Sequence, residues 1–245
     1  MTQNNPKILV TICNYNHSKY LEQSIKSIQA QTYSNLDICV VDDGSNDIDK
    51  VIDIVETLKS EDKRIRFINL KKNYGKWFSL NAAIETSDAF ICTSHDADDI
   101  SLKDRIDMQL FAMNKTNTVH NLCGFHHCWK EEDIEEHIND LIDTQNVRVV
   151  GPEPVKKMVF EGFKHPRINH YFTGNFETAG VSAMFLRELW SAGLRFNPPG
   201  IGLRVLLSED SDFNFRCTML TSSTSILAEK PYLYRRNTGT NQEQY

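Results

Sequence analysis

Three aspartates stand close together just before residue 100: Asp96, Asp98 and Asp99. They follow the apolar segment 89–93, which has the composition of a buried strand. Alternate carboxylates at a strand end can point toward one point, and carboxylate oxygens are the ligands that Mg²⁺ and Mn²⁺ prefer. A metal ion held there would bind a diphosphate and neutralise it as it leaves. The alternative is a turn that caps a helix starting at Leu102.

A second acidic pair, Asp42 and Asp43, ends another apolar segment, 36–41. A carboxylate at the end of a strand can accept hydrogen bonds from the base or ribose of a nucleotide. An Asx-turn that runs through Gly44 explains the same residues equally well. Two acidic clusters at two strand ends together favour the metal site at Asp96–Asp99 over a simple turn.

A third acidic group comes late in the chain and contains Glu209, Asp210 and Asp212. It precedes the apolar segment 213–219, which we expect to be helical. One of these carboxylates could act as a general base. The alternative is the ordinary enrichment of acidic residues at the N-terminus of a helix.

The segment 123–128 combines two cysteines with two histidines. It lacks a second pair of ligands at the spacing of structural zinc sites, and Phe125 in its middle is typical of a strand with alternating faces. We therefore expect a strand there. The basic pairs 71–72 and 235–236 could meet a diphosphate, with ordinary surface charge as the alternative.

The elements that must position these clusters alternate between strand and helix over residues 1–113. Strands are expected at 8–13, 36–41, 65–70 and 89–93, and helices near 18–28, 51–58, 76–85 and 102–113. This alternation predicts right-handed βαβ units and a mostly parallel sheet covered by helices. Ligands of such sheets bind at the carboxyl ends of the strands, where 14–16, 42–43 and 96–99 all fall.

Residues 114–245 are less regular. We expect an acidic helical stretch at 130–142, loop and strand material at 151–164 and 172–180, a helix at 185–192, a turn at 197–200 and a frayed polar tail from Asn237. No linker separates the two parts. We therefore expect a single domain over 1–245, with a nucleotide-sugar-binding half at 1–113 and an acceptor-binding, catalytic half at 114–245.

Composition sets limits on the partners of the chain. Among its 245 residues, 40% are hydrophobic and 24% are charged, and the net charge of −6 argues against nucleic acid as a partner. No apolar run reaches the roughly 18 residues of a membrane span, and residues 1–6 do not look like a signal peptide. The expected compartment is the cytoplasm, with peripheral membrane association left open. The six dispersed cysteines are expected to be free thiols.

Taken together, these clusters resemble the family 2 glycosyltransferases, the large inverting family with the GT-A fold. Residues 8–16 are similar to the family's first strand and nucleotide loop, 20–33 to its first helix, and 40–45 to its second strand. The Asn-x-Gly segment at 73–75 and the helix that follows, the DxD motif at 96–99, the late Glu-Asp motif at 209–213 and the Tyr-Arg tail at 234–235 continue the same order. The resemblance is specific over the first half of the chain and patchy afterwards.

The resemblance implies a role for each matched residue. Asp43 would contact the base and Asp96 the ribose, while Asp98, with Asp96 and Asp99, would hold Mn²⁺ or Mg²⁺. Asp210 would be the catalytic base, with Glu209 orienting the acceptor. The nucleotide-sugar-binding set is completed by Thr11, Asn14, Asn16 and Lys76. No histidine follows Tyr234-Arg235, so water is expected in place of a third protein ligand.

These expectations combine into an inverting, metal-dependent glycosyltransferase, a hexosyl or related sugar transferase. The expected donor is a nucleoside diphosphate sugar, most simply a UDP-sugar, and the acceptor is a hydroxyl of a glycan, a lipid-linked sugar or a protein. A nucleotidyltransferase is one alternative, although the loop after the first strand lacks the glycines of that class. A non-catalytic sugar-nucleotide-binding module is the other, although the acids of all three clusters are present.

Overall fold

The computed structural model describes residues 5–140, 147–151, 178, 180–201, 208–221, 223–236 and 238. Its strands are β1 (Ile8–Asn14), β2 (Leu36–Asp42), β3 (Ile65–Asn69), β4 (Ile91–Asp96), β5 (Ile100–Ser101), β6 (His120–Cys128), β7 (Val147–Val150), β8 (Met184–Leu186) and β9 (Thr224–Arg235). Its helices are α1 (Ser18–Gln29), α2 (Ile48–Glu61), α3 (Lys76–Glu85), α4 (Arg105–Thr116), α5 (Glu131–His137), the short η1 (Gly180–Ser182), α8 (Arg187–Ser191) and α9 (Glu209–Thr221).

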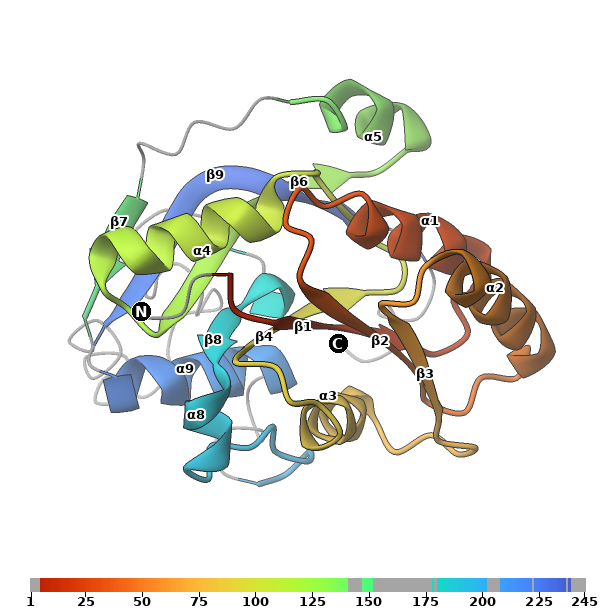
Figure 1. Cartoon of the computed structure of the whole chain (residues 1–245), viewed down its shortest axis with the longest axis horizontal. Helices are drawn as coiled ribbons and strands as arrows, with labels where there is room; N and C mark the ends of the chain where they lie inside the picture. The colour runs from red at the N-terminus through yellow and green to blue at the C-terminus, as the bar shows by residue number, and fades with distance from the viewer. Residues whose placement is uncertain are drawn as a thin grey trace.

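The strands of the described residues form one sheet in the order β3-β2-β1-β4-β8-β6-β9-β5, with β7 beside β9 (Figure 1). The neighbours among β1 to β4 are parallel, which confirms the predicted βαβ half. Beyond β4 the sheet is mixed, because β8 runs antiparallel to both β4 and β6. The sheet therefore continues from the first half of the chain into the second.

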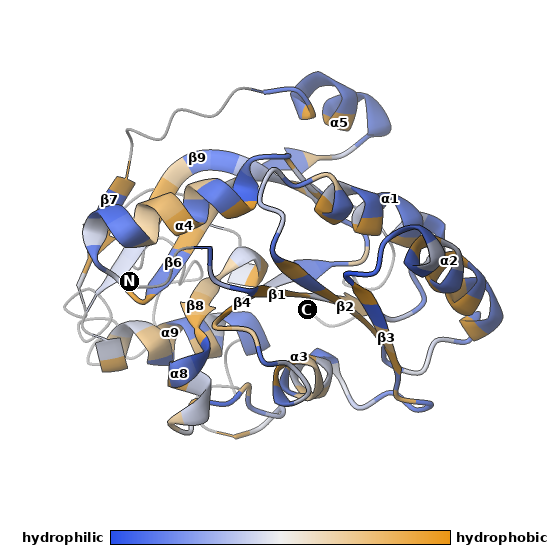
Figure 2. Ribbon diagram, in the orientation of Figure 1, coloured by the Kyte–Doolittle hydropathy of each residue, from blue (hydrophilic) through white to orange (hydrophobic). Residues whose placement is uncertain are grey.

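The first strands are apolar on both faces, and helices cover both faces (Figure 1). Ile8, Val10 and Ile12 of β1 pack with the buried residues of α1 and α2, and Leu9 packs on the opposite side with Leu80 of α3. Figure 2 shows the apolar colour on these central strands, whereas α5 is mainly hydrophilic. Burial of these two layers orients the strands and brings their carboxyl ends to one edge.

Two of the boundaries that differ from the sequence prediction concern the acidic turn. β4 continues to Asp96, and the next residues turn into the short strand β5, which pairs with β9. The N–H of Leu102 donates to the carbonyl of Pro231 in β9 (2.9 Å), so α4 begins only at Arg105, with Asp104 at its N-cap. The proposed capping role of Asp96–Asp99 for a helix at Leu102 is therefore wrong.

The later segments are confirmed in part. The acidic stretch contains α5, segment 123–128 lies in β6, and the segment expected as one helix at 185–192 divides into the end of β8 and α8. The segments 152–177 and 202–207 and the tail from 237, apart from Thr238, lie outside the described residues. All six cysteines are free thiols, as expected. Among the described helices, none is long and apolar enough to cross a bilayer.

Candidate active site

The structure brings the three aspartates of the first cluster together at the end of β4. One carboxylate oxygen from each of Asp96, Asp98 and Asp99 lies within 4.8 Å of the other two. Asp98 and Asp99 are buried and Asp96 is half-buried. Three carboxylates in a poorly solvated space repel one another unless a cation stands among them. The donor set, oxygen alone, fits Mg²⁺ or Mn²⁺.

Asp99 is the member of this cluster that holds the fold. Its Oδ2 accepts the Tyr232 hydroxyl (2.8 Å), and its Oδ1 accepts the N–H of Arg235 (2.8 Å). The same Tyr232 hydroxyl accepts the N–H of Asp96 (3.2 Å). Burial raises the pKa of Asp99 well above its usual range, and the charges of Asp98 and Asp96 raise it further. Asp99 thus attaches β9 to the acidic turn, and Asp96 and Asp98 are the better placed ligands.

Asp96 forms an ion pair with Lys76, the first residue of α3. The Lys76 Nζ lies 2.5 Å from Oδ1 of Asp96. Burial raises the pKa of Asp96 to about 6, the Lys76 charge opposes that rise, and the charges of Asp98 and Asp210 add to it. Lys76 is affected in the opposite sense: burial lowers its pKa, but the charges of Asp96, Glu209 and Asp210 outweigh burial and raise it well above the usual value.

Lys76 therefore lies within electrostatic reach of two acidic clusters that are 110 or more residues apart in the chain. Its ammonium is a permanent positive charge beside the proposed metal ligands. A cation in this place suits an anionic diphosphate. The acidic turn at 96–99 and the acidic start of α9 thus both act on the Lys76 ammonium.

Asp98 has a different environment from its neighbours. Its Oδ2 accepts the Thr238 hydroxyl (2.6 Å) and lies 3.9 Å from Nε2 of His17. Its backbone carbonyl accepts Nη1 of Arg235 (2.5 Å). Sequence reasoning did not single out His17 as a site residue. The available signal was its position directly after the loop 14–16, which ends a strand at the same edge of the sheet.

The second acidic pair divides into two roles. Asp42 accepts the N–H groups of Gly44 (3.1 Å) and Ser45 (2.9 Å), so the Asx-turn belongs to Asp42. Asp43 instead accepts the N–H groups of Tyr74 and Gly75, each at 2.8 Å. Burial raises the pKa of Asp43, and those two hydrogen bonds oppose the rise.

Gly44 is required for the loop that carries Asp43 to close on segment 72–75. Its φ is +77°, and a Cβ at this position would lie 2.6 Å from the backbone carbon of Lys72. Glycine alone adopts this conformation without strain and leaves room for the neighbouring backbone. Beyond this contact, the half-exposed Tyr74 ring stacks on Phe78 (centroids 4.8 Å apart).

The predicted nucleotide-binding residues of β1 and of the loop after it lie at different depths. Thr11 is buried in the middle of the strand, three residues before its end. Asn14, the last residue of β1, donates from Nδ2 to Asp42 (2.7 Å) and to Ser45 (3.1 Å). Asn16 Oδ1 accepts the N–H of Asn46 (2.8 Å). Asn14 and Asn16 shape the loop at the carboxyl edge, whereas Thr11 lies below that edge.

Asp210 lies in the first turn of α9 against η1. Its Oδ1 accepts the N–H of Ser211 (2.7 Å) and the hydroxyl of Ser208. Its Oδ2 points toward Gly180, where an added Cβ would lie only 2.8 Å away. The Asn214 side chain donates to the Gly180 carbonyl (3.0 Å), which holds η1 against α9. Gly180 thus provides the space for the Asp210 carboxylate, a role that no sequence motif indicated.

The other two acids of the late motif are separated by the helix. Asp212 is fully buried and pairs with Arg216 one turn later (2.6 Å) and with the Asn197 amide (3.2 Å). This pairing commits Asp212 to α9 and its neighbours. Glu209, at the first position of α9, is half-buried and contributes with Asp210 to the positive pKa shift of Lys76.

The sequence model of glycosyl transferase family 2 matches residues 9–191, from β1 to α8. The match includes the whole parallel half of the sheet and the acidic turn after β4. The chain belongs to this family.

Relatives within the family are found in bacteria and archaea. An uncharacterized glycosyltransferase of Methanocaldococcus jannaschii is 27% identical over 231 residues, which cover 94% of this chain and 71% of the relative. One from Haemophilus influenzae is 39% identical over 99 residues, or 40% of this chain and 30% of the relative. The matched segment therefore covers less than a third of the Haemophilus protein.

Solved glycosyltransferases share the GT-A fold of this family 2 chain. Staphylococcus aureus TarS in complex with UDP-GlcNAc aligns with 98% of this chain and 61% of its own, with a TM-score of 0.68 at 16% identity. The mannosyltransferase PcManGT from Pyrobaculum calidifontis, in complex with GDP-Man and Mn²⁺, aligns with 98% of this chain and 59% of its own, with a TM-score of 0.64 at 17% identity. The mixed sheet and its flanking helices confirm the predicted fold class.

Proposed function

We propose that this family 2 chain transfers a sugar from a nucleoside diphosphate sugar to an acceptor hydroxyl with inversion at the anomeric carbon. The observation that carries the proposal is the convergence on Lys76 of the acidic turn after β4 and the acidic start of α9. The acidic turn after β4 suits a metal-bound diphosphate, and the acidic start of α9 offers a base. Family membership favours sugar transfer over the nucleotidyltransferase alternative.

The donor would lie along the carboxyl edge of β1, β2 and β4. Asp98 and Asp96 would hold Mn²⁺ or Mg²⁺, whose chemistry is to neutralise the diphosphate. His17 is close enough to Asp98 to be considered a third protein ligand in place of the expected water. Lys76 would contact the diphosphate as a second cation. The exposed Tyr74 ring and the loop anchored by Asp43 would contact the base.

The donor is proposed to be a UDP-sugar. TarS binds UDP and UDP-GlcNAc and PcManGT binds GDP-Man, so the uracil–guanine choice differs among proteins of this fold. The resemblance of 40–45 to the family's nucleoside segment supports a nucleoside donor, and the choice of uracil is our proposal. Comparison of UDP- and GDP-sugars is therefore part of the test.

The proposed chemistry uses one base. Asp210 would remove the proton of the acceptor hydroxyl, and the oxygen would form a bond to the anomeric carbon as the bond to the diphosphate breaks. The nucleoside diphosphate departs with the electron pair. General base catalysis of this kind contributes roughly 10²–10⁴ to the rate. Glu209, the preceding residue, would orient the acceptor.

A screen of nucleotide sugars tests the proposal. UDP- and GDP-sugars are incubated with the protein and Mn²⁺, Mg²⁺ or EDTA, and release of the nucleoside diphosphate is measured with and without simple glycan acceptors. We expect release from one donor class, dependent on the metal. Binding of a donor without release would favour the non-catalytic module, and pyrophosphate release from a nucleoside triphosphate would favour a nucleotidyltransferase.

A further inference from the structure

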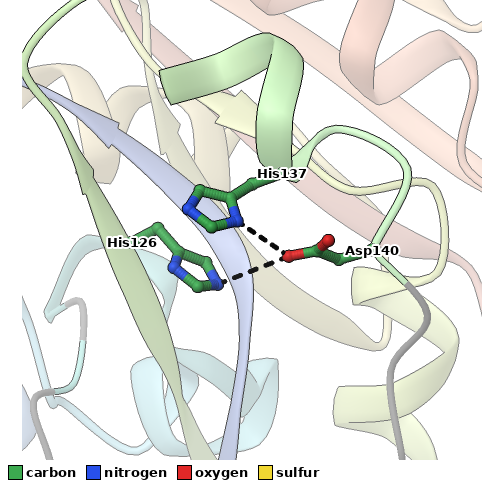
Figure 3. A group of neighbouring side chains, drawn as sticks. All are labelled: His126, His137 and Asp140. Carbon is green, nitrogen blue, oxygen red and sulfur yellow. Dashed lines mark hydrogen bonds and ion pairs between the residues drawn. The ribbon is translucent and has the colours of Figure 1, made fainter. Parts of the chain in front are cut away.

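A second group of metal-ligating side chains lies away from the acidic turn, between β6 and α5 (Figure 3). His126 comes from β6, His137 is the last residue of α5, and Asp140 follows three residues later. Nδ1 of His137 lies 2.9 Å from Oδ2 of Asp140, and Nε2 of His126 lies 3.8 Å from the same oxygen. Two imidazoles from different elements thus present a nitrogen to one carboxylate oxygen.

The spacing of these atoms fits a small divalent cation. Zinc-to-ligand bonds of about 2.0–2.1 Å in a tetrahedron place neighbouring ligand atoms about 3.3–3.4 Å apart. The two measured nitrogen–oxygen distances, 2.9 and 3.8 Å, lie on either side of that value. All three ligand atoms are within 4.8 Å of one another.

The two rings are held as a stacked pair, with centroids 3.8 Å apart and an angle of 17° between their planes. Two imidazolium cations at this separation would repel each other, so the arrangement favours neutral rings, the form that binds metals. Because the lone pair of each nitrogen lies in the plane of its ring, one ring must turn out of the stack before both nitrogens can bind the same ion. The three side chains are partly open to solvent, with exposures of 25%, 26% and 43% for His126, His137 and Asp140. An ion can therefore enter, and water can complete its coordination.

We propose that His126, His137 and Asp140 form a second metal site, specific for Zn²⁺ and similar transition-metal ions and separate from the acidic turn that would bind Mg²⁺ or Mn²⁺. Imidazole nitrogen selects Zn²⁺, Co²⁺ or Ni²⁺, whereas carboxylate oxygens alone select Mg²⁺ and Mn²⁺. This inference does not depend on the proposed sugar transfer. The site also differs from a zinc site built from 123–128 alone. Of that segment only His126 takes part, while Cys123 donates to Ser182. The other two proposed ligands come from α5 and the residues after it.

The site would fasten the end of α5 to the sheet. α5 is short, and such helices depend on tertiary contacts for their stability. At its other end, Glu131 pairs with Arg235 (3.0 Å), and Arg235 contacts the Asp98 carbonyl. A metal ion at His137 would therefore stabilise a helix that also supports the acidic turn.

Metal titration of the whole protein tests the site. Zn²⁺ binding is followed by calorimetry in excess Mg²⁺, which keeps the acidic turn supplied with its preferred ion, and Co²⁺ is followed by its visible absorption. We expect one tightly bound ion per chain, an intense four-coordinate Co²⁺ spectrum and a higher melting temperature with Zn²⁺. His126→Ala and His137→Ala should each weaken Zn²⁺ binding at least tenfold, and Asp140→Asn should weaken it less.

His127→Ala is the matched control, since His127 is adjacent to His126 but contacts Arg236. It should bind Zn²⁺ as the unmodified protein does. Circular dichroism melts without metal establish that each variant is folded, and Asp140→Asn, on the exposed side of the site, provides a folded test if a histidine variant is not. Absence of Zn²⁺ binding in excess Mg²⁺, or unchanged binding in His126→Ala and in Asp140→Asn, would overturn the proposal.

Discussion

Asp210 has one carboxylate oxygen held by Ser208 and Ser211 and the other directed at Gly180, so its position is fixed before any substrate binds. Asp210→Asn keeps the size of the side chain but removes the proposed base. We expect donor binding to persist and transfer to fall by about two to four orders of magnitude. Donor affinity and kcat are measured for Asp210→Asn beside Glu209→Gln and Asp212→Asn.

The three variants separate catalysis from structure. Asp212→Asn weakens a buried ion pair with Arg216, so its main effect should be a lower free energy of unfolding. Glu209→Gln should raise the acceptor KM more than it lowers kcat. Substantial transfer by Asp210→Asn, together with loss of transfer in the folded Glu209→Gln variant, would assign the base to Glu209 instead.

Asp96 makes the stability of the metal-free protein depend on pH. Burial raises its pKa to about 6, so between about pH 4 and pH 6 the folded state holds a proton that the unfolded state has released. Stability due to this group therefore decreases as the pH rises through that interval. Asp96→Asn resembles the protonated form, so the variant should gain stability relative to the unmodified protein as the pH rises.

Urea unfolding in EDTA at pH 4.5 and pH 7 measures this effect. The difference in unfolding free energy between Asp96→Asn and the unmodified protein should grow by about 2 kcal/mol over this range. The pKa of about 6 already includes the opposing effect of the Lys76 charge, which favours the carboxylate. A difference that does not change with pH would show that the Asp96 pKa is close to its usual value.

At the scale of elements, β9 positions the acidic turn through Tyr232. Its hydroxyl donates to Asp99 and accepts the N–H of Asp96, so one buried group joins the end of β4 to β9. Tyr232→Phe leaves both partners without this hydrogen bond. We expect a loss of about 1–3 kcal/mol in unfolding free energy, measured by urea denaturation. The phenylalanine ring would fill nearly the same volume, so a loss below about 0.5 kcal/mol would mean that the hydroxyl does not support the turn.

The elements that the sequence predicted well are those with local signals. The strands at 8–13 and 36–41 and the helices that follow them have regular apolar spacing, and each is confirmed. The start of α4 was misplaced, because the N–H of Leu102 is used by β9, a strand about 130 residues later. The end of the segment 185–192 is the helix α8, as predicted. The first residues of the segment belong instead to strand β8, which pairs with β4 and β6.

At the scale of the whole molecule, the sequence placed the acidic clusters at strand ends but could not show what surrounds them. The approach of Lys76 to Glu209 and Asp210, of His17 to Asp98, and of Gly180 to Asp210 depends on the packing of segments far apart in the chain. The hydrogen bonds by which Asp99 holds β9 also join segments that are far apart in the chain. The fold shows that Asp99 and Asp212 are held in structural contacts, and Asp96, Asp98 and Asp210 stay our proposed ligands and base.

The central claim is that the acidic turn after β4 binds a divalent metal that holds a nucleoside diphosphate. Calorimetric titration of UDP in Mn²⁺ and in EDTA, with the unmodified protein and with Asp98→Asn, tests it most directly. We expect binding that requires Mn²⁺ and weakens roughly tenfold to a hundredfold in the folded Asp98→Asn variant. UDP affinity that is the same with Mn²⁺ and EDTA, or the same in both proteins, would contradict the account.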